Sequence, residues 1–201
     1  NGYGGIFKAR HRFDQPRGYD SHRTTIRLLQ GFRGTSGKWD WDTGFLMSQA
    51  KSKQNNTGRQ SLTLLNQALA LSTPDAYNPF CGSNCNDESS FTIDIVRGNT
   101  TALYLMDFKA STPELFDAPA GPVGMLVGFE IRRNKYTDDR DPRINGDVTY
   151  TVPVGPKTGE TFPIISDIVN SSATPNSKGS RTTTSLFTEF AIPLHETVDE
   201  Q

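Results

Sequence analysis

The stretch GKWDWDTGFLMSQ, residues 37–49, alternates between two kinds of side chain. From Trp39 to Met47 its odd positions are aromatic or apolar apart from one threonine: Trp39, Trp41, Thr43, Phe45 and Met47. Its even positions include Asp40 and Asp42. Successive side chains of a β-strand point to opposite faces, so the alternation predicts a strand with one apolar and one polar face. Alternation alone leaves open whether the apolar face meets a protein core or lipid.

Four further segments have strand character: residues 23–32, 103–111, 123–135 and 182–194. One face of the predicted strands carries apolar side chains: Phe45, Met47, Met106, Phe108, Val127, Phe129, Ile131, Phe190 and Ile192. The opposite face carries charged ones: Asp40, Asp42, Asp107, Lys109, Glu130, Arg132 and Glu189. The sequence therefore predicts a mainly β fold, an antiparallel up-and-down meander of about five strands.

The connections between these strands differ strongly in length. Two are short, near residues 34–38 and 114–122, and two are long, about residues 50–102 and 136–181. Because short and long connections alternate, both long loops project from the same edge of the sheet. Outer-membrane barrels have this pattern, with short periplasmic turns and long extracellular loops. Within the first long loop, residues 59–72 place leucines at helical spacing, which predicts a short helix that ends before Pro74.

Strand length and the tryptophan pair favour lipid over a protein core. A tilted strand of about 10 residues, rising ~3.3 Å per residue, matches the ~25 Å apolar band of a membrane barrel. Trp39 and Trp41 follow a short turn, where aromatic side chains anchor barrels at the membrane–water boundary. Tyr104 and Tyr136 are candidates for the other boundary. On this interpretation the apolar face listed above meets lipid, and the charged face lines a polar lumen.

Composition narrows the functional classes. The chain has 201 residues, 34% of them hydrophobic, and a net charge of −1, so it has no basic field for nucleic acid. No apolar run approaches the ~20 residues of a transmembrane helix. The only two cysteines, Cys81 and Cys85, are too few for a zinc site and predict a small disulfide-closed loop in an oxidising compartment.

Two groups of carboxylates are candidate chemical sites. Glu130 and Glu189, with Asp107, suggest a glycosidase pair, but their position in alternating strands favours ion pairs with basic residues on the same face. Residues 137–147 hold several aspartates that suggest calcium, but their spacing does not fit an EF-hand loop, which favours a solvated loop. We therefore expect no catalytic residue, metal or cofactor.

Several stretches, in order, resemble the barrel of TonB-dependent outer-membrane receptors. RTTIRLLQGFRGTSGKWDWDTGFLMSQAK (residues 23–51) resembles one of its hairpins, and AYNPFCGSNC (residues 76–85) resembles the following extracellular loop. MDFKASTPELFDAPAGPVGMLVGFEIRRNKY (residues 106–136) resembles the next hairpin, and SLFTEFAIPL (residues 185–194) the strand after it. Each motif is weak alone, whereas their shared order covers most of residues 20–195.

The resemblance implies that residues 1–201 are a middle part of such a barrel, without its plug domain. The complete receptor would lie in the bacterial outer membrane, surrounded by lipid, and import a nutrient (an iron complex, vitamin or oligosaccharide) with energy from TonB, which would contact the missing N-terminal part. The alternatives are a secreted β-sandwich module that binds carbohydrate or protein through Trp39 and Trp41, and a β-sandwich hydrolase that uses Glu130 and Glu189.

Overall fold

The computed structural model describes residues 11–81, 87–148, 150–152, 157–162 and 166–194. Strands account for 64% of the described residues, and the main sheet is a five-strand antiparallel meander that does not close into a barrel. The predicted mainly β meander is confirmed.

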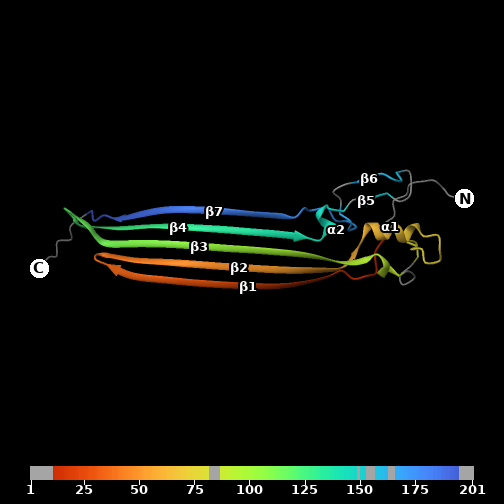
Figure 1. Ribbon diagram of the computed structural model, residues 1–201, viewed down its shortest axis with the longest axis horizontal. Helices are drawn as coiled ribbons and strands as arrows, with labels where there is room; N and C mark the ends of the chain where they lie inside the picture. The colour runs from red at the N-terminus through yellow and green to blue at the C-terminus, as the bar shows by residue number, and fades with distance from the viewer. Residues whose placement is uncertain (1–10, 82–86, 149, 153–156, 163–165, 195–201) are drawn as a thin grey trace. The chain divides into compact units, whose positions relative to one another are not determined.

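The main sheet contains five long strands: β1 (Gly18–Ser36), β2 (Trp39–Gln60), β3 (Thr92–Ala118), β4 (Gly121–Arg140) and β7 (Ser177–Ala191). Their order in the sheet is β1-β2-β3-β4-β7, so each strand pairs with its neighbour in sequence except for the short strands between β4 and β7 (Figure 1). Both predicted turns are tight. Gly37 and Gly121 take positive φ angles of 62° and 128° at these turns, a backbone region that glycine enters without steric cost.

The strands are longer than the alternation predicted. β2 continues to Gln60, β3 begins at Thr92 and β4 ends at Arg140, so the long connections shrink to residues 61–91 and 141–176. The predicted loop bounds of 50–102 and 136–181 were therefore wrong. The added strand residues are largely polar, as in KSKQNNTGRQ (residues 51–60). Hydrogen bonds to the neighbouring strands continue along these polar residues, although neither face of the strand is apolar. The alternation of apolar and polar side chains therefore ends before the strand ends.

The chain divides into two compact units. The first unit comprises Asn1–His22, Lys53–Gly98 and Asp138–Ser177, and the second comprises Arg23–Ser52, Asn99–Thr137 and Lys178–Gln201. Each long strand thus contributes residues to both units, with the exception of β7, which lies almost wholly in the second.

The first unit holds the helices and the short strands: α1 (Leu62–Ala70), η1 (Glu88–Ser90), α2 (Pro142–Asn145), β5 (Tyr150–Thr151) and β6 (Thr161–Phe162). The predicted helix in residues 59–72 is confirmed as α1. The small core of the first unit consists of Tyr77, Phe91, Ile95 and Ile168, each buried. No helix of the described residues is long and apolar enough to cross a membrane.

Candidate functional site

The second unit leaves many of its large apolar side chains exposed, although Val123 is buried. Many of these side chains lie on one face of the main sheet, which we call the apolar face. Ten of its large side chains are each 36% to 68% exposed: Ile26, Leu28, Phe32, Phe45, Met47, Tyr104, Met106, Ile131, Phe190 and Ile192. Phe108, Val127 and Phe129 are half-buried on the same face, and the rings of Phe108 and Phe129 stack with centroids 5.9 Å apart. A hollow of about 380 Å³ on this face is lined mainly by apolar side chains of β1 to β4.

Charged side chains of the second unit form short-range pairs with one another. Lys109 Nζ lies 3.7 Å from Asp42 Oδ1, and Arg132 Nε lies 3.5 Å from Glu130 Oε1. Thr35 donates a hydrogen bond to Asp40 at 2.8 Å. Arg132 is thus the basic partner of Glu130 that the sequence favoured over a catalytic carboxylate pair, whereas Lys109 pairs with Asp42, which was not one of the candidate catalytic carboxylates.

Asp107 and Glu189 are the remaining charged residues of the polar face. A Cβ built at Gly44 would lie 3.2 Å from Asp107 Oδ2, so Asp107 packs over that glycine. Glu189 is exposed on β7. The structure thus does not join Glu189 to Glu130 through any described contact.

The four boundary aromatics do not share one face. The Trp41 ring packs against Gly34, and Trp39 lies two residues earlier in the same strand, β2. Tyr104 lines the apolar hollow. Tyr136, in contrast, packs over Gly179, on the face opposite to the apolar face.

Strand parity fixes this position of Tyr136. Gly128 faces the Phe187 ring, so it lies on the opposite face of β4 from Phe129. Tyr136 is eight positions from Gly128 in the same strand and therefore shares its face. The expectation of Tyr136 as a lipid-boundary residue beside Tyr104 is corrected, because it considered residue type and strand end but not parity.

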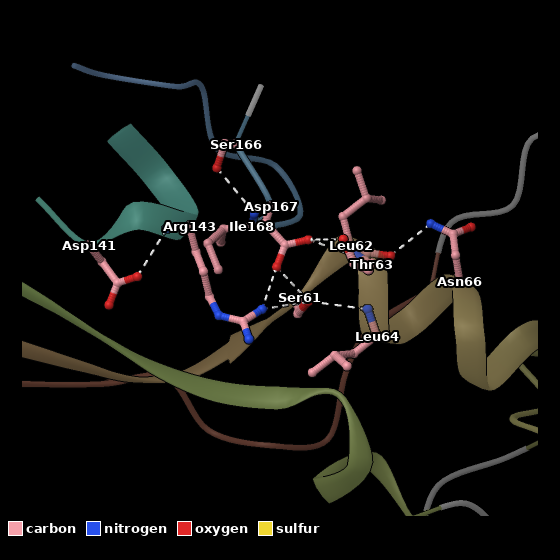
Figure 2. Close-up of polar contacts among 10 residues, drawn as sticks. All are labelled: Ser61, Leu62, Thr63, Leu64, Asn66, Asp141, Arg143, Ser166, Asp167 and Ile168. Carbon is pink, nitrogen blue, oxygen red and sulfur yellow. Dashed lines mark hydrogen bonds and ion pairs between the residues drawn. The ribbon is translucent and has the colours of Figure 1, made fainter. Parts of the chain in front are cut away.

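In the first unit, a buried carboxylate joins three separate segments; we call it the Asp167 junction (Figure 2). The Asp167 side chain is 2% exposed. Its Oδ1 accepts hydrogen bonds from the backbone N–H and the hydroxyl of Thr63, at 2.8 and 2.5 Å. Its Oδ2 accepts from the Ser61 hydroxyl at 2.7 Å and from Arg143 Nη1 at 2.6 Å. One carboxylate therefore fixes the start of α1 to α2 and to the segment that follows β6.

The junction also caps α1. Ser61 is the N-cap residue, and its hydroxyl oxygen accepts a hydrogen bond from Leu64 N at 3.2 Å. The first turn of α1 contains no acidic residue of its own. Asp167 supplies that negative charge from a distant segment, where it satisfies a free N–H and interacts favourably with the helix dipole.

Backbone hydrogen bonds reinforce the junction. Leu62 N donates to the Asp167 carbonyl at 2.5 Å, and Asp167 N donates to the Arg143 carbonyl at 2.7 Å. Burial alone would raise the pKa of the Asp167 carboxyl, but hydrogen bonds from Thr63, Ser61 and Arg143 outweigh burial and hold this pKa below its usual range. The carboxylate is therefore ionised at neutral pH.

Ser61, Asp167 and Arg143 contact one another directly through their side chains. The Ser61 hydroxyl donates directly to Asp167, and no histidine or other base stands between them among the residues drawn in Figure 2. The arrangement fixes backbone geometry and positions α1.

A second buried carboxylate, Glu88, joins the segment before β1 to Tyr77. Glu88 Oε2 accepts hydrogen bonds from the backbone N–H groups of Asp14 and Gln15 at 2.9 and 3.0 Å. The Tyr77 hydroxyl lies 3.4 Å from Glu88 Oε1 and 2.6 Å from His11 Nε2. Burial and the nearby negative charge of Glu88 raise the pKa of Tyr77 to about 12.

Three of the four aspartates in residues 137–147 have protein partners. Asp138 accepts a two-point contact from Arg97 at 2.7 and 2.8 Å, and Arg140 also donates to it. Asp141 caps α2, and Asp147 accepts from Asn145. Among the described residues no cluster of three or more His, Cys, Asp or Glu side chains is arranged to hold a metal ion. Ion pairs, a helix cap and a side-chain hydrogen bond thus occupy three of the four aspartates that suggested calcium.

Cys81 is disulfide-bonded, and Cys85 lies outside the described residues. The chain matches no known protein family, no curated protein and no solved structure. The functional argument therefore rests on the residues and their arrangement.

Sequence reasoning missed the Asp167 junction and Glu88. Ser61 before a leucine-rich run was a usable N-cap signal. Asp167 and Arg143 lie far from Ser61 in sequence, in segments without hydrophobic periodicity. No local pattern in a single sequence reports such a contact.

Proposed function

We propose that the chain is part of an outer-membrane active-transport receptor, which binds a nutrient outside the cell and imports it with energy from TonB. The observation that carries the membrane part is the apolar face of the second unit. The nutrient and TonB parts rest on the ordered sequence motifs in residues 23–51, 76–85, 106–136 and 185–194.

The apolar face supports lipid contact because it is contiguous across several strands and exposed. Soluble monomers rarely expose contiguous apolar patches beyond a few hundred Å². A β-sandwich would cover this face with a second sheet. The other sheet of the described residues consists of β5 and β6, each two residues long, and belongs to the first unit.

The opposite face suits a watery lumen. Its ion pairs, Asp42 with Lys109 and Glu130 with Arg132, involve side chains that are still substantially exposed to solvent. Barrel strands alternate between an apolar outer face and a polar inner face. The edge strands β1 and β7 would pair with neighbouring strands of the same barrel, which removes the unpaired edges that otherwise cause aggregation.

A quenching experiment tests this proposal. The chain contains only two tryptophans, Trp39 and Trp41. We expect their fluorescence, in the 201-residue chain reconstituted into phosphatidylcholine–phosphatidylglycerol vesicles, to be quenched by lipids brominated near the headgroup more strongly than by lipids brominated at the acyl-chain end.

Two variants in neighbouring positions of β7 add a matched control. Phe190→Arg places a charge on the apolar face and should reduce insertion, since Arg on a lipid face costs free energy, from about 0–1 kcal/mol near the membrane boundary to about 2–4 kcal/mol at the bilayer midplane. Glu189→Arg places the same side chain on the other face and should insert like the parent. A chain that is monomeric in buffer without detergent, with tryptophans that brominated lipids do not quench, would refute the membrane assignment.

A further inference from the structure

A hollow of about 590 Å³ lies beside α1 in the first unit. Its apolar wall comes from Leu64, Ala68, Leu71 and Tyr77, and its carboxylates are Asp75 and Asp87. No Lys, Arg or His is among the described residues that line it. Pockets of roughly 300–1,000 Å³ suit small molecules, so this hollow has the size of a ligand site.

The walls of the α1 hollow are fixed by contacts that do not depend on a ligand. Tyr77 N donates to the Ala68 carbonyl at 3.1 Å, and the Tyr77 ring meets Phe91 edge-on with centroids 4.8 Å apart. Asp87 caps η1 by accepting from Ser89 N at 2.8 Å. The Asp167 junction holds the N-terminal end of α1. A preformed pocket loses little entropy when a ligand binds.

The charge of the hollow is one-sided. Hydrogen bonds from Ser89 hold the pKa of the Asp87 carboxyl below its usual range, and the only other charged residue type among the described lining residues is a second aspartate, the exposed Asp75. Anionic ligands are therefore disfavoured. A sugar would need an open aromatic face on which to stack, whereas Tyr77 is only 7% exposed.

We propose that the α1 hollow binds a small amphiphilic cation, in which an apolar ring or short hydrocarbon body lies against Leu64, Ala68 and Leu71 and a protonated amine meets Asp75 and Asp87. This inference deepens the proposed receptor function, on which it rests for its biological meaning. It names the class of compound that the first unit selects.

Binding can be measured on the 201-residue chain in detergent micelles by isothermal titration, separately from membrane insertion. The probes are 2-phenylethylamine, the neutral 2-phenylethanol and the anionic 3-phenylpropanoate. We expect the amine to bind about tenfold or more tightly than the alcohol, with an affinity that weakens as salt rises, and the anion not to bind.

Three variants test the assigned contacts. Asp75→Asn and Asp87→Asn each remove one charge while an amide oxygen remains, which for Asp87 preserves the cap of η1, and each should weaken amine binding about tenfold. Asp94→Asn, an exposed aspartate of β3 outside the hollow, is the control and should bind like the parent. Ala68→Phe fills the hollow and should weaken the binding of the amine and the alcohol alike.

Equal binding of amine and alcohol, unchanged binding in both Asn variants, or no binding of the amine would each overturn the proposal. Such a failure leaves the tryptophan quenching result untouched, and a failure of quenching leaves amine binding measurable. The two proposals are therefore tested apart.

Discussion

Asp167→Asn is the sharpest perturbation of the first unit. The asparagine keeps the size of the side chain and one oxygen for Thr63. Its amide nitrogen cannot accept hydrogen bonds from the Ser61 hydroxyl or from Arg143 Nη1, which both donate to the aspartate. The variant thus removes the charge and places donors against donors in a site that is 2% exposed.

The cost follows from the number and kind of bonds lost. Hydrogen bonds to a charged group contribute about 1.5–3 kcal/mol, against about 0.5–1.5 kcal/mol for neutral ones. The Arg143 side chain is 41% exposed, so water replaces much of its lost ion pair, and that part is worth only about 1 kcal/mol or less. Together we expect a loss of about 2–4 kcal/mol in the local stability of α1.

Hydrogen exchange of the α1 amides measures this loss directly. At 1.4 kcal/mol per factor of ten, a local loss of 2–4 kcal/mol increases exchange roughly 30- to 700-fold. Asp94→Asn is the matched control, because it changes the same atoms at an exposed position of the first unit, and it should leave exchange within about threefold. Unchanged exchange across Leu62–Ala70 in Asp167→Asn would refute the role assigned to the junction.

The pH dependence gives an independent check with a definite sign. The pKa of Asp167 is lowered by folding, so its contribution to stability is present above the unfolded aspartate pKa of about 3.9 and is lost as pH falls from there through the folded pKa. Protection of α1, corrected for intrinsic exchange, should therefore decrease below about pH 4 in the parent. Asp167→Asn should show no such decrease.

Two further predictions concern buried contacts. Folding raises the pKa of Tyr77 to about 12, so the parent should lose stability as pH rises from about 10 to 12. Tyr77→Phe loses the contact with Glu88, at a cost of about 1 kcal/mol, but should not show this loss of stability with rising pH. Thermal melts followed by circular dichroism measure both effects. A Cβ at Gly128 would overlap the Phe187 ring, so in denaturant titrations Gly128→Ala should lower the free energy of unfolding by about 1–3 kcal/mol. Gly98 has open space around it, so the control Gly98→Ala should cost less than about 0.5 kcal/mol. Equal effects of the two variants would contradict the packing argument.

Alternation predicted the strands well where one face is apolar. Residues 37–49 lie in β2 apart from the two turn residues, and residues 123–135 lie wholly in β4. The polar continuations of β2, β3 and β4 could not be predicted, because their strand conformation depends on ladder hydrogen bonds to neighbouring strands and not on a local hydrophobic pattern. Loop bounds inherited this error.

The helix and its cap were within reach of the sequence, whereas the contacts around the helix were not. Leucine spacing located α1, and Ser61 was a visible cap. The partner that completes the cap, Asp167, lies more than a hundred positions away. Its recognition would require knowing that the segments before α1 and after β6 meet, which depends on the tertiary fold.

The two units derive their stability from different sources, and one variant can separate them. The first unit buries its own core and its charged junctions, whereas the second unit leaves the large side chains of its apolar face exposed. Asp167→Asn should therefore loosen α1 and weaken 2-phenylethylamine binding in the α1 hollow, because Leu64 and Ala68 lie in that helix. It should leave the quenching of Trp39 and Trp41 by brominated lipid unchanged, since both tryptophans belong to the second unit. Loss of quenching together with loss of binding would show that the junction supports the whole sheet, and the division into a ligand-selecting unit and a lipid-facing unit would then be wrong.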